Sequence, residues 1–465
     1  KSVGSGVMLR GARPTGTSLD YRGQEVCPRE VLSLIQRALW QKIIPFMEDF
    51  LNYPWPSHQF HPIIHHLKIN WLGLLMKFGI DAISFYTSNY YIDLKTLAEA
   101  RKVDPAKFYD DLGQKKMAIA PPNEDAVTLA ANAVSGVLKD EDIANIEMVL
   151  FATETGVDLS KAAATYIHKL FNLPKRCRVV ELKQACYSAT FGLQMGLAWL
   201  RQNSEKKVLL IASDIARYEF NTTAESSQGC GAIAMLLSAN PRLLEIESVS
   251  GFCTKETMDF WRPNYFDIAL VDGRLSCDTY MRFAEETWQQ YAQLTGRKFE
   301  DHDRFCYHTP VAKLAERTHK KLARINGIKN LTEEQIDYQV GQSLIYSREV
   351  GNCYTASLYL GVLSLLENVT TDLSEKLIGL YSYGSGSSGE FFAAHVVNNY
   401  QNQLSREHHQ QMLATRQELS VAEYEEFYRF KTPVDGSVLK LPTWQTGKFR
   451  LQALEQHQRI YEQVE

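Results

Sequence analysis

The chain has 465 residues, of which 45% are hydrophobic and 22% charged, the proportions of an ordinary globular protein. This length allows two domains or one large duplicated fold. The formal net charge of −4 gives no reason to expect a nucleic acid or an anionic membrane as a partner. No segment has the pattern of a transmembrane helix or a secretory signal.

The eight cysteines are scattered through apolar stretches and form no CxxC pair. Scattered cysteines of this kind are typical of reduced thiols in the cytosol. We therefore expect a cytoplasmic protein.

Residues 1–75 differ in character from the rest of the chain. The first 25 are rich in Gly, Arg and Ser, which is typical of loops, whereas residues 31–51 have helical periodicity. The chain begins with Lys, and the pattern of a first strand and turn opens at Met76. We expect 1–75 to be a loop-like, partly helical extension outside the main fold, and Met76 to be the functional start.

Four histidines gather in the extension, at His58, His61, His65 and His66. They could bind a metal ion, but no carboxylate or cysteine is spaced to complete a site. We therefore favour a solvated linker and expect no metal.

From Met76 onward, strand patterns alternate with helix patterns. In the first part we expect strands over 147–153, 206–214 and 231–238, and helices over 93–100, 124–138 and 158–171, with Asp158 as an N-cap. The second part repeats the alternation, with a strand at 305–310, helices over 311–325 and 352–368, and a strand over 378–386. This repetition predicts an α/β fold built by duplication, with helices covering mainly apolar sheets.

Cys186 lies where a strand pattern becomes a helix pattern. The strand-like RVVEL (178–182) precedes it, and the uncharged run from Ala185 to Leu200 predicts a helix apolar on all sides, which is normally buried. Near the N-terminus of such a helix, unpaired N–H groups and the dipole would stabilise a thiolate. The alternative is an inert core cysteine, because free cysteine is among the most buried residue types.

Three strand ends carry polar residues at the places where α/β proteins hold their sites. Glu154 follows one buried strand, Cys186 opens a helix, and His308 follows another strand. A cysteine nucleophile, a histidine and a carboxylate can form a covalent acyl-transfer site. Singly, Glu154 could cap a helix and His308 could be a core histidine, but their joint placement favours a site.

The segment GSGSSG (384–389) matches the GxGxxG pattern of dinucleotide sites. Such a site needs a second strand ending in an acidic residue about 20 positions later. The chain instead runs into FFAAHVVNNY and a polar stretch. We therefore expect these glycines to bring N–H groups close to a thioester oxygen, as in an oxyanion hole.

The motifs together resemble bacterial 3-hydroxy-3-methylglutaryl-CoA (HMG-CoA) synthase, in the family's order from residue 76 to about 430. The matching segments include ATETG, ELKQACYSAT, SDIARY, ESSQGCGAIAM, FWRP, LVDGRLS, HTPVAKL, VGNCYTASLYL and YSYGSGSSGEFF. The resemblance implies a thiolase-like, duplicated αβαβα layered fold, with halves at 76–245 and 246–465, and usually a homodimer. It implies condensation of acetyl-CoA with acetoacetyl-CoA to HMG-CoA in the mevalonate pathway, without a cofactor.

The same resemblance implies roles for matching residues. Cys186 would carry the acetyl group, Glu154 would remove a proton from its methyl, and His308 would hold the second substrate and assist proton movement. Four more residues would bind substrate: Asn352 and Ser385 the acyl oxygens, Tyr218 the pocket wall, and Lys313 the CoA phosphates.

Two features are less regular. Thr155 and Gly156 follow ATE where the family more often has Ser followed by Ala or Gly, a departure we expect to be tolerated. Beyond about residue 430 the match fades, and we expect a hairpin and a final helix.

Three rival functions remain. A polyketide β-branching synthase would run the same chemistry on substrates bound to acyl carrier protein, although the FWRP to LVDGRLS region favours CoA. A ketoacyl-ACP synthase III would use a Cys-His-Asn set, whereas this chain has an acid in ATETG. A catalytically inactive scaffold is disfavoured by the intact set of three residues.

Overall fold

The computed structural model describes residues 18–19, 25–26 and 76–464. The chain divides into two units, Lys1–Leu75 and Met76–Glu465. In the first unit, β1 (Ser18–Leu19) and β2 (Glu25–Val26) pair antiparallel. The helix expected over 31–51 and the four histidines lie outside the described residues. All that follows concerns the second unit.

One large sheet runs through the second unit and has two halves. The first half has the strand order β7-β6-β8-β9-β3, formed by β3 (Phe78–Tyr86), β6 (Ile146–Ala152), β7 (Arg178–Leu182), β8 (Lys207–Ile215) and β9 (Cys230–Ala239). The second half has β14-β15-β16 with two short strands on β16, formed by β10 (Leu244–Ile246), β11 (Gly251–Thr254), β14 (Arg304–Tyr307), β15 (Leu377–Gly384) and β16 (Ser388–Val396).

The two halves repeat the same pairing pattern. In the first, β6 pairs parallel with β8, β8 antiparallel with β9, and β9 antiparallel with β3. In the second, β14 pairs parallel with β15, β15 antiparallel with β16, and β16 antiparallel with β10 and β11. The duplication predicted from the sequence is therefore present in the strand order and strand direction.

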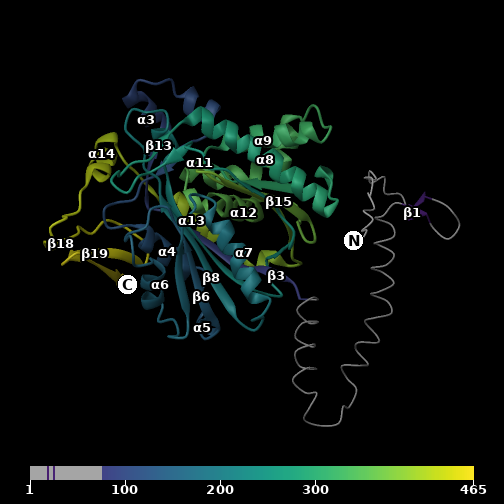
Figure 1. Cartoon of the computed structure of the whole chain (residues 1–465). Coiled ribbons are helices and arrows are strands. Elements are labelled where there is room, and N and C mark those ends of the chain that lie inside the picture. The colour runs from purple at the N-terminus through teal and green to yellow at the C-terminus, as the bar shows by residue number, and fades with distance from the viewer. Residues whose placement is uncertain (1–17, 20–24, 27–75, 465) are drawn as a thin grey trace, which may run out of the picture. The chain divides into compact units, whose positions relative to one another are not determined.

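Helices cover both halves in layers (Figure 1). The first half carries α4 (Ala126–Ser135) and α6 (Ala164–Leu170) outside, and the second carries α8 (Gly273–Thr295) and α9 (Ala312–Ile325). Between the halves lie α7 (Ser188–Leu200) and α12 (Ser357–Asn368), joined by a 2.9 Å hydrogen bond between the Thr190 and Tyr359 hydroxyls. These five layers are the αβαβα arrangement that we expected.

The strand β10 joins the halves. It pairs antiparallel with β3 on one side and with β16 on the other. The boundary drawn between residues 245 and 246 therefore falls inside a strand, and both halves belong to one compact unit.

Smaller elements frame the layers. Further helices are α3 (Leu94–Arg101), α5 (Asp140–Ile143), α10 (Glu333–Gln339), α11 (Ile345–Val350), α13 (Arg406–Ala414) and α14 (Val421–Arg429). Small sheets are formed by β4 (Tyr90–Asp93) with β5 (Lys116–Ala118) and β17 (Gln417–Glu418), by β12 (Phe260–Trp261) with β13 (Leu270–Val271), and by β18 (Leu439–Lys440) with β19 (Phe449–Glu455) and β20 (Gln458–Gln463).

Most predicted elements are confirmed, and two details are wrong. Asp158 does not cap the helix that follows: its carboxylate accepts from the Ser160 and Lys161 N–H groups, and α6 begins only at Ala164. At the C-terminus the expected hairpin is present as β19 and β20, but the described residues beyond 430 contain no final helix.

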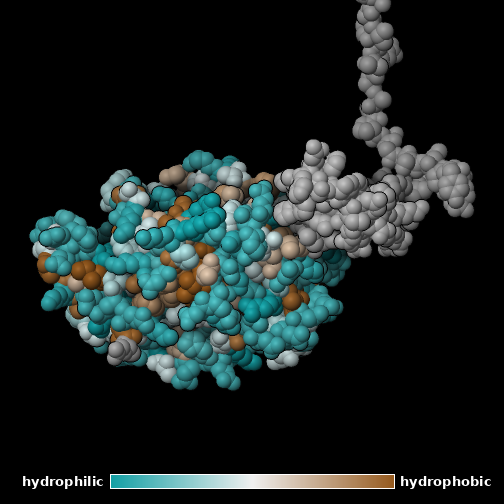
Figure 2. Space-filling view, turned by 90° about the horizontal axis from the view of Figure 1, so that it is seen from below, coloured by the Kyte–Doolittle hydropathy of each residue, from teal (hydrophilic) through white to brown (hydrophobic). Residues whose placement is uncertain are grey.

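The face shown in Figure 2 is mainly hydrophilic, with several hydrophobic patches. None of the helices in the described part of the chain is long and apolar enough to cross a membrane.

Candidate active site

Cys186 lies in a tight turn between β7 and α7. The preceding Ala185 has a φ of 43°, and α7 begins two residues after the cysteine, at Ser188. The side chain is partly exposed. Its thiol donates to Glu154 Oε1 over 3.1 Å, so the two residues predicted to start the chemistry are in direct contact.

The structure corrects the expectation of a stabilised thiolate. Burial, the Glu154 charge and the hydrogen bond to that carboxylate raise the pKa of Cys186 well above its ordinary value. Because the sulfur precedes α7 and faces a carboxylate, these effects outweigh the helix dipole. The resting cysteine is therefore a neutral thiol.

Glu154 follows β6, and its main chain is fixed by Asp214 of β8. The N–H groups of Glu154 and Thr155 donate to Asp214 Oδ1 over 2.9 Å and 3.0 Å. Burial and the nearby Asp214 charge raise the pKa of Glu154 to about 8. A carboxylate held out of water in this way is a stronger base than a solvated one.

Asp214 connects both halves of the fold. Besides the Glu154 loop, its carboxylate accepts from the Thr355 N–H and hydroxyl, at 3.1 Å and 2.5 Å. Asp214 is fully buried. Sequence reasoning missed this residue, although an acid at the end of the apolar strand KKVLLIASD was a signal for it.

His308 follows β14 and approaches the same end of the sheet from the second half. The main-chain N–H of His308 donates to the Tyr381 carbonyl over 2.7 Å, and its main-chain carbonyl accepts from the Tyr280 hydroxyl over 2.6 Å. Its Nδ1 is buried and has no partner among the described residues. Burial lowers the pKa of His308 to about 3, so the ring is neutral at physiological pH.

The strand β15 lies between His308 and the nucleophile. Tyr381 pairs in register with Tyr307, and Gly384 lies three residues further along. A Cβ on Gly384 would lie only 2.5 Å from the Gln184 carbonyl oxygen and 2.6 Å from the Tyr187 nitrogen. This glycine therefore lets β15 reach the turn that carries Cys186.

Tyr218 lies beside Cys186, and Asn352 lies near Tyr218. Tyr218 is buried beside Cys186 in a small apolar cluster with Tyr354. Burial raises the pKa of Tyr218, and the nearby polar groups of Tyr354 and Asn352 oppose the rise. Asn352 Oδ1 accepts from the Tyr354 N–H and the Ser357 hydroxyl, each over 2.9 Å, which fixes the amide.

The GSGSSG segment is a tight turn between the antiparallel strands β15 and β16. Since no helix follows it, the dinucleotide interpretation is excluded. The Gly386 N–H donates to Asp259 Oδ1 and the Ser387 N–H to the Lys255 carbonyl, both over 2.8 Å, so these two groups cannot serve an oxyanion hole as we expected. Ser385 lies at the turn, where its carbonyl accepts from Gln184 Nε2 over 3.4 Å.

Lys313, expected to approach the CoA phosphates, is engaged elsewhere. Its ammonium pairs with Glu316 over 2.7 Å, and Arg348 pairs with the same carboxylate over 2.8 Å. Lys313 remains partly exposed, so a phosphate can compete for it only by displacing this ion pair.

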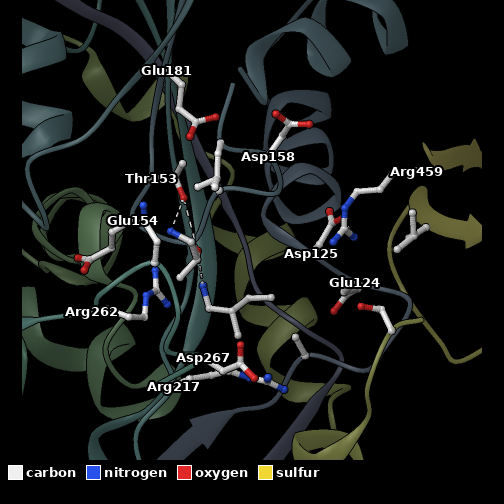
Figure 3. A pocket seen from close by; sticks show the side chains of 18 of the residues that line it. Glu124, Asp125, Thr153, Glu154, Asp158, Glu181, Arg217, Arg262, Asp267 and Arg459 are labelled. Atoms are coloured by element: carbon white, nitrogen blue, oxygen red, sulfur yellow. Dashed lines mark hydrogen bonds and ion pairs between the residues drawn. The ribbon is translucent and has the colours of Figure 1, made fainter. Parts of the chain in front are cut away.

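A cavity of about 980 Å³ opens beside Glu154 (Figure 3). It is lined by both signs of charge, including Asp158, Glu181, Arg217 and Arg262. Glu154 lines this cavity, whereas Cys186 and His308 do not.

Known proteins are similar to this chain in sequence. The family models for the N-terminal and C-terminal parts of hydroxymethylglutaryl-coenzyme A synthase match residues 75–241 and 318–434. The hydroxymethylglutaryl-CoA synthase of Enterococcus faecalis is 44% identical over 353 residues, which cover 76% of this chain and 92% of that protein.

The chain belongs to the hydroxymethylglutaryl-CoA synthase family.

A solved structure and a second sequence relative agree with this assignment. An HMG-CoA synthase crystallised with CoA has a TM-score of 0.80 at 38% identity, and covers 84% of this chain and 100% of its own. A polyketide 3-hydroxy-3-methylglutaryl-ACP synthase from Bacillus subtilis is less similar, at 32% identity over 76% of this chain and 88% of that protein. The chain is therefore an acyltransferase with the thiolase-like fold of the synthase family.

The departure after ATE is accommodated within the synthase fold. The Thr155 hydroxyl donates to Asp214 Oδ1 over 2.7 Å, as a serine hydroxyl in its place could. At Gly156 a Cβ would lie 2.5 Å from Glu181 Oε1, so an alanine here would require the Glu181 carboxyl to shift.

Within residues 76–464 no group of three or more histidine, cysteine or acidic side chains is arranged to hold a metal ion.

Proposed function

We propose that this synthase condenses acetyl-CoA with acetoacetyl-CoA and water, giving HMG-CoA and CoA through an acetyl group on Cys186. The observation that carries the proposal is the 3.1 Å contact between the Cys186 thiol and Glu154 at the edge of a duplicated sheet. A nucleophile and a base in contact can attack the same small acyl group in succession.

In the first step, the Cys186 sulfur attacks the carbonyl carbon of acetyl-CoA. The bond between that carbon and the CoA sulfur breaks, and the thiol proton leaves with CoA. Acetyl-Cys186 remains as a thioester. Since a thioester acidifies its own methyl group, the second step can then use a carboxylate as base.

In the second step, Glu154 removes a proton from the acetyl methyl. The resulting carbanion attacks the ketone carbon of acetoacetyl-CoA, and the new alkoxide takes up a proton. Water then cleaves the thioester to Cys186 and releases HMG-CoA with a free carboxylate. A base whose pKa is raised to about 8 by burial is suited to this work near neutral pH.

The other residues bind the second substrate. His308 holds a carbonyl oxygen of acetoacetyl-CoA and assists proton movement. Its low pKa of about 3 supports a neutral ring, which can donate one hydrogen bond to that oxygen. Asn352 and Ser385 bind acyl oxygens, Tyr218 forms the pocket wall, and Lys313 meets the CoA phosphates. No cofactor takes part.

We favour CoA over carrier protein as the carrier of the acyl groups. The support is the higher identity to the Enterococcus faecalis CoA enzyme than to the Bacillus subtilis ACP enzyme, 44% against 32%. The product would enter the mevalonate pathway in the cytoplasm, as the scattered cysteines lead us to expect.

We also propose a homodimer that covers the first half of the sheet. The strand β7 lies at the end of the strand order, and its Val180 is 43% exposed. On α7, which the sequence predicted to be buried, Phe191 and Met195 are 44% and 49% exposed. A second copy packed on this face would bury them. Val180→Lys should then give a monomer by light scattering, and an unchanged size for the variant would argue against this interface.

The proposed reaction is tested by offering the enzyme acetyl-CoA with acetoacetyl-CoA, and in parallel acetyl-carrier protein with acetoacetyl-carrier protein. We expect HMG-CoA by mass spectrometry in the first mixture and little product in the second. Product only in the second mixture would favour the polyketide function, and product in neither would refute both.

A further inference from the structure

Arg262 faces the Glu154 carboxyl from the second half of the fold. It follows β12 directly and lines the same cavity as Glu154, and the two side chains lie next to each other in Figure 3. Its positive charge lowers the pKa of that carboxyl, although burial and the Asp214 charge raise it by more.

The backbone before Arg262 is firmly anchored. The Phe260 ring packs edge-on against Tyr218 and Tyr354, with centroids 6.1 Å and 5.7 Å apart. The buried Asp259 accepts from the Gly386 N–H over 2.8 Å and from the Tyr383 hydroxyl over 2.8 Å. The peptide that carries Arg262 therefore has a fixed position relative to the nucleophile's turn.

The Arg262 guanidinium is not held by any other side chain of residues 76–464. Within residues 76–464 Arg262 makes no hydrogen bond or ion pair. Its neighbours in the cavity differ in this respect, since Lys431 pairs with Asp267 over 2.7 Å and Arg217 donates to the Tyr428 carbonyl over 3.0 Å. Arg262 can thus keep its charge directed at Glu154.

The groups facing Glu154 come from several elements and act in opposite directions. Asp214 of β8 raises its pKa, whereas the Cys186 thiol and Arg262 lower it. Tyr218 and Tyr354 also lie close, but as buried phenols with raised pKa values they are neutral. Two groups therefore favour the ionised carboxylate, a thiol donor and a guanidinium.

Acetylation of Cys186 removes one of these two groups. When the sulfur gains the acetyl group it has no hydrogen left to donate, so the 3.1 Å hydrogen bond to Glu154 is lost. Yet the proposed base must be ionised in the acetyl-enzyme, because that is when it removes the methyl proton. Arg262 is then the remaining group that favours the carboxylate.

We propose that Arg262 is a positioning residue that keeps Glu154 ionised once Cys186 carries the acetyl group. The inference rests on the proposed function. It assigns Arg262 to the condensation half of the reaction and leaves acetyl transfer largely independent of it.

The test compares Arg262→Gln and Arg262→Lys with the wild type, with Lys431→Gln as the matched control. The control removes a cation from the same cavity, but one already paired with Asp267. For each protein we would measure acetylation of Cys186 by acetyl-CoA alone, and the pH profiles of kcat and KM for HMG-CoA formation.

For Arg262→Gln we expect the acidic limb of the kcat profile to move up by about one pH unit, and kcat at pH 7 to fall roughly 10-fold. Acetylation and KM should change by less than about 3-fold, because the nucleophile is untouched. Arg262→Lys and Lys431→Gln should keep the wild-type profile.

An unmoved kcat profile in Arg262→Gln would overturn the inference, and so would a rise in KM alone, which would make Arg262 a binding residue for the anionic substrate. Acetylation lost together with condensation in both Arg262 variants would indicate a structural role and overturn it too. Failure of the wild type to form HMG-CoA would instead refute the proposed function.

Discussion

Glu154 and His308 occupy equivalent positions in the two halves of the fold. Glu154 follows β6 and His308 follows β14, and each of these strands pairs parallel with the next strand of its half, β8 or β15. Burial acts on the two side chains in opposite directions, raising the pKa of the acid to about 8 and lowering that of the histidine to about 3. Duplication has thus supplied one side chain for proton abstraction and one neutral hydrogen-bonding ring.

This pair predicts a simple pH dependence. Condensation needs ionised Glu154, so kcat should rise with increasing pH over a limb at or above about 8, because the acetyl-enzyme lacks the Cys186 thiol that lowers this pKa. His308 should add no further limb near neutral pH, because its ring stays neutral above a pKa of about 3. The measurement is kcat for HMG-CoA formation from pH 6 to 9.5, at saturating substrates. A plateau already reached at pH 6 would contradict the assignment of Glu154 as base.

Removal of the base should separate the two half-reactions. In Glu154→Gln the Cys186 thiol loses the negative charge that raises its pKa, so acetyl transfer should continue. Condensation should fall about 10²–10⁴-fold, the usual contribution of a general base. Acetyl-enzyme mass and HMG-CoA formation are measured on the same samples, and near-normal condensation would remove Glu154 from its role.

The same substitution should stabilise the protein at high pH. Because its pKa is raised, Glu154 keeps its proton in the folded protein at pH values where the unfolded chain has lost it. Its contribution to the free energy of unfolding is therefore complete below about pH 4.5 and is lost as the pH rises to about 8. Glu154→Gln, which has no such titration, should therefore gain stability relative to the wild type over this range, by on the order of 2 kcal/mol after allowance for partial exposure.

Urea unfolding at pH 5 and pH 8.5 measures this difference. The exposed Glu205→Gln serves as the control and should show little change between the two pH values. An advantage for Glu154→Gln that is equal at both would show that the carboxyl is not perturbed by folding.

Gly384 should be essential for the approach of β15 to the nucleophile. In Gly384→Ala the new Cβ meets backbone atoms of Gln184 and Tyr187 at 2.5–2.6 Å, which no side-chain movement can relieve. We expect acetylation to fall at least about 100-fold, because a shift of about 1 Å at an active site has effects of that size. Gly273→Ala, where a Cβ meets nothing within 4 Å, is the control, and equal activity of the two variants would contradict the account.

The sequence predicted the layers and the meeting of Cys186 with Glu154 because both depend on local patterns. Apolar runs such as KKVLLIASD can only be inner strands, and their polar ends must meet at one edge of the sheet. Tyr218 lies beside Cys186, as the two residues' shared pocket would require, but its role is not tested by this contact. The roles given to all seven site residues stay predictions.

What the sequence could not predict depends on distant partners in some places and on competing local structure in others. The neutral state of the Cys186 thiol follows from Glu154, 32 residues earlier. The prediction that Asp158 caps a helix was wrong because its carboxylate accepts hydrogen bonds within a local turn. The prediction of a final helix was wrong because residues 449–463 form two antiparallel strands, which pair as a hairpin. Asp214 and Arg262 act across the two halves, a relationship that only the fold reveals.

A single-turnover chase shows whether Cys186 carries the acetyl group that ends in the product. Enzyme is incubated with labelled acetyl-CoA, freed of CoA, digested and mapped, and a second portion is mixed with acetoacetyl-CoA. We expect the label on the peptide containing Cys186 and its transfer into HMG-CoA, with neither in Cys186→Ser. Label that stays on the enzyme after acetoacetyl-CoA is added, or labelling of the Cys186→Ser protein, would contradict this role of Cys186.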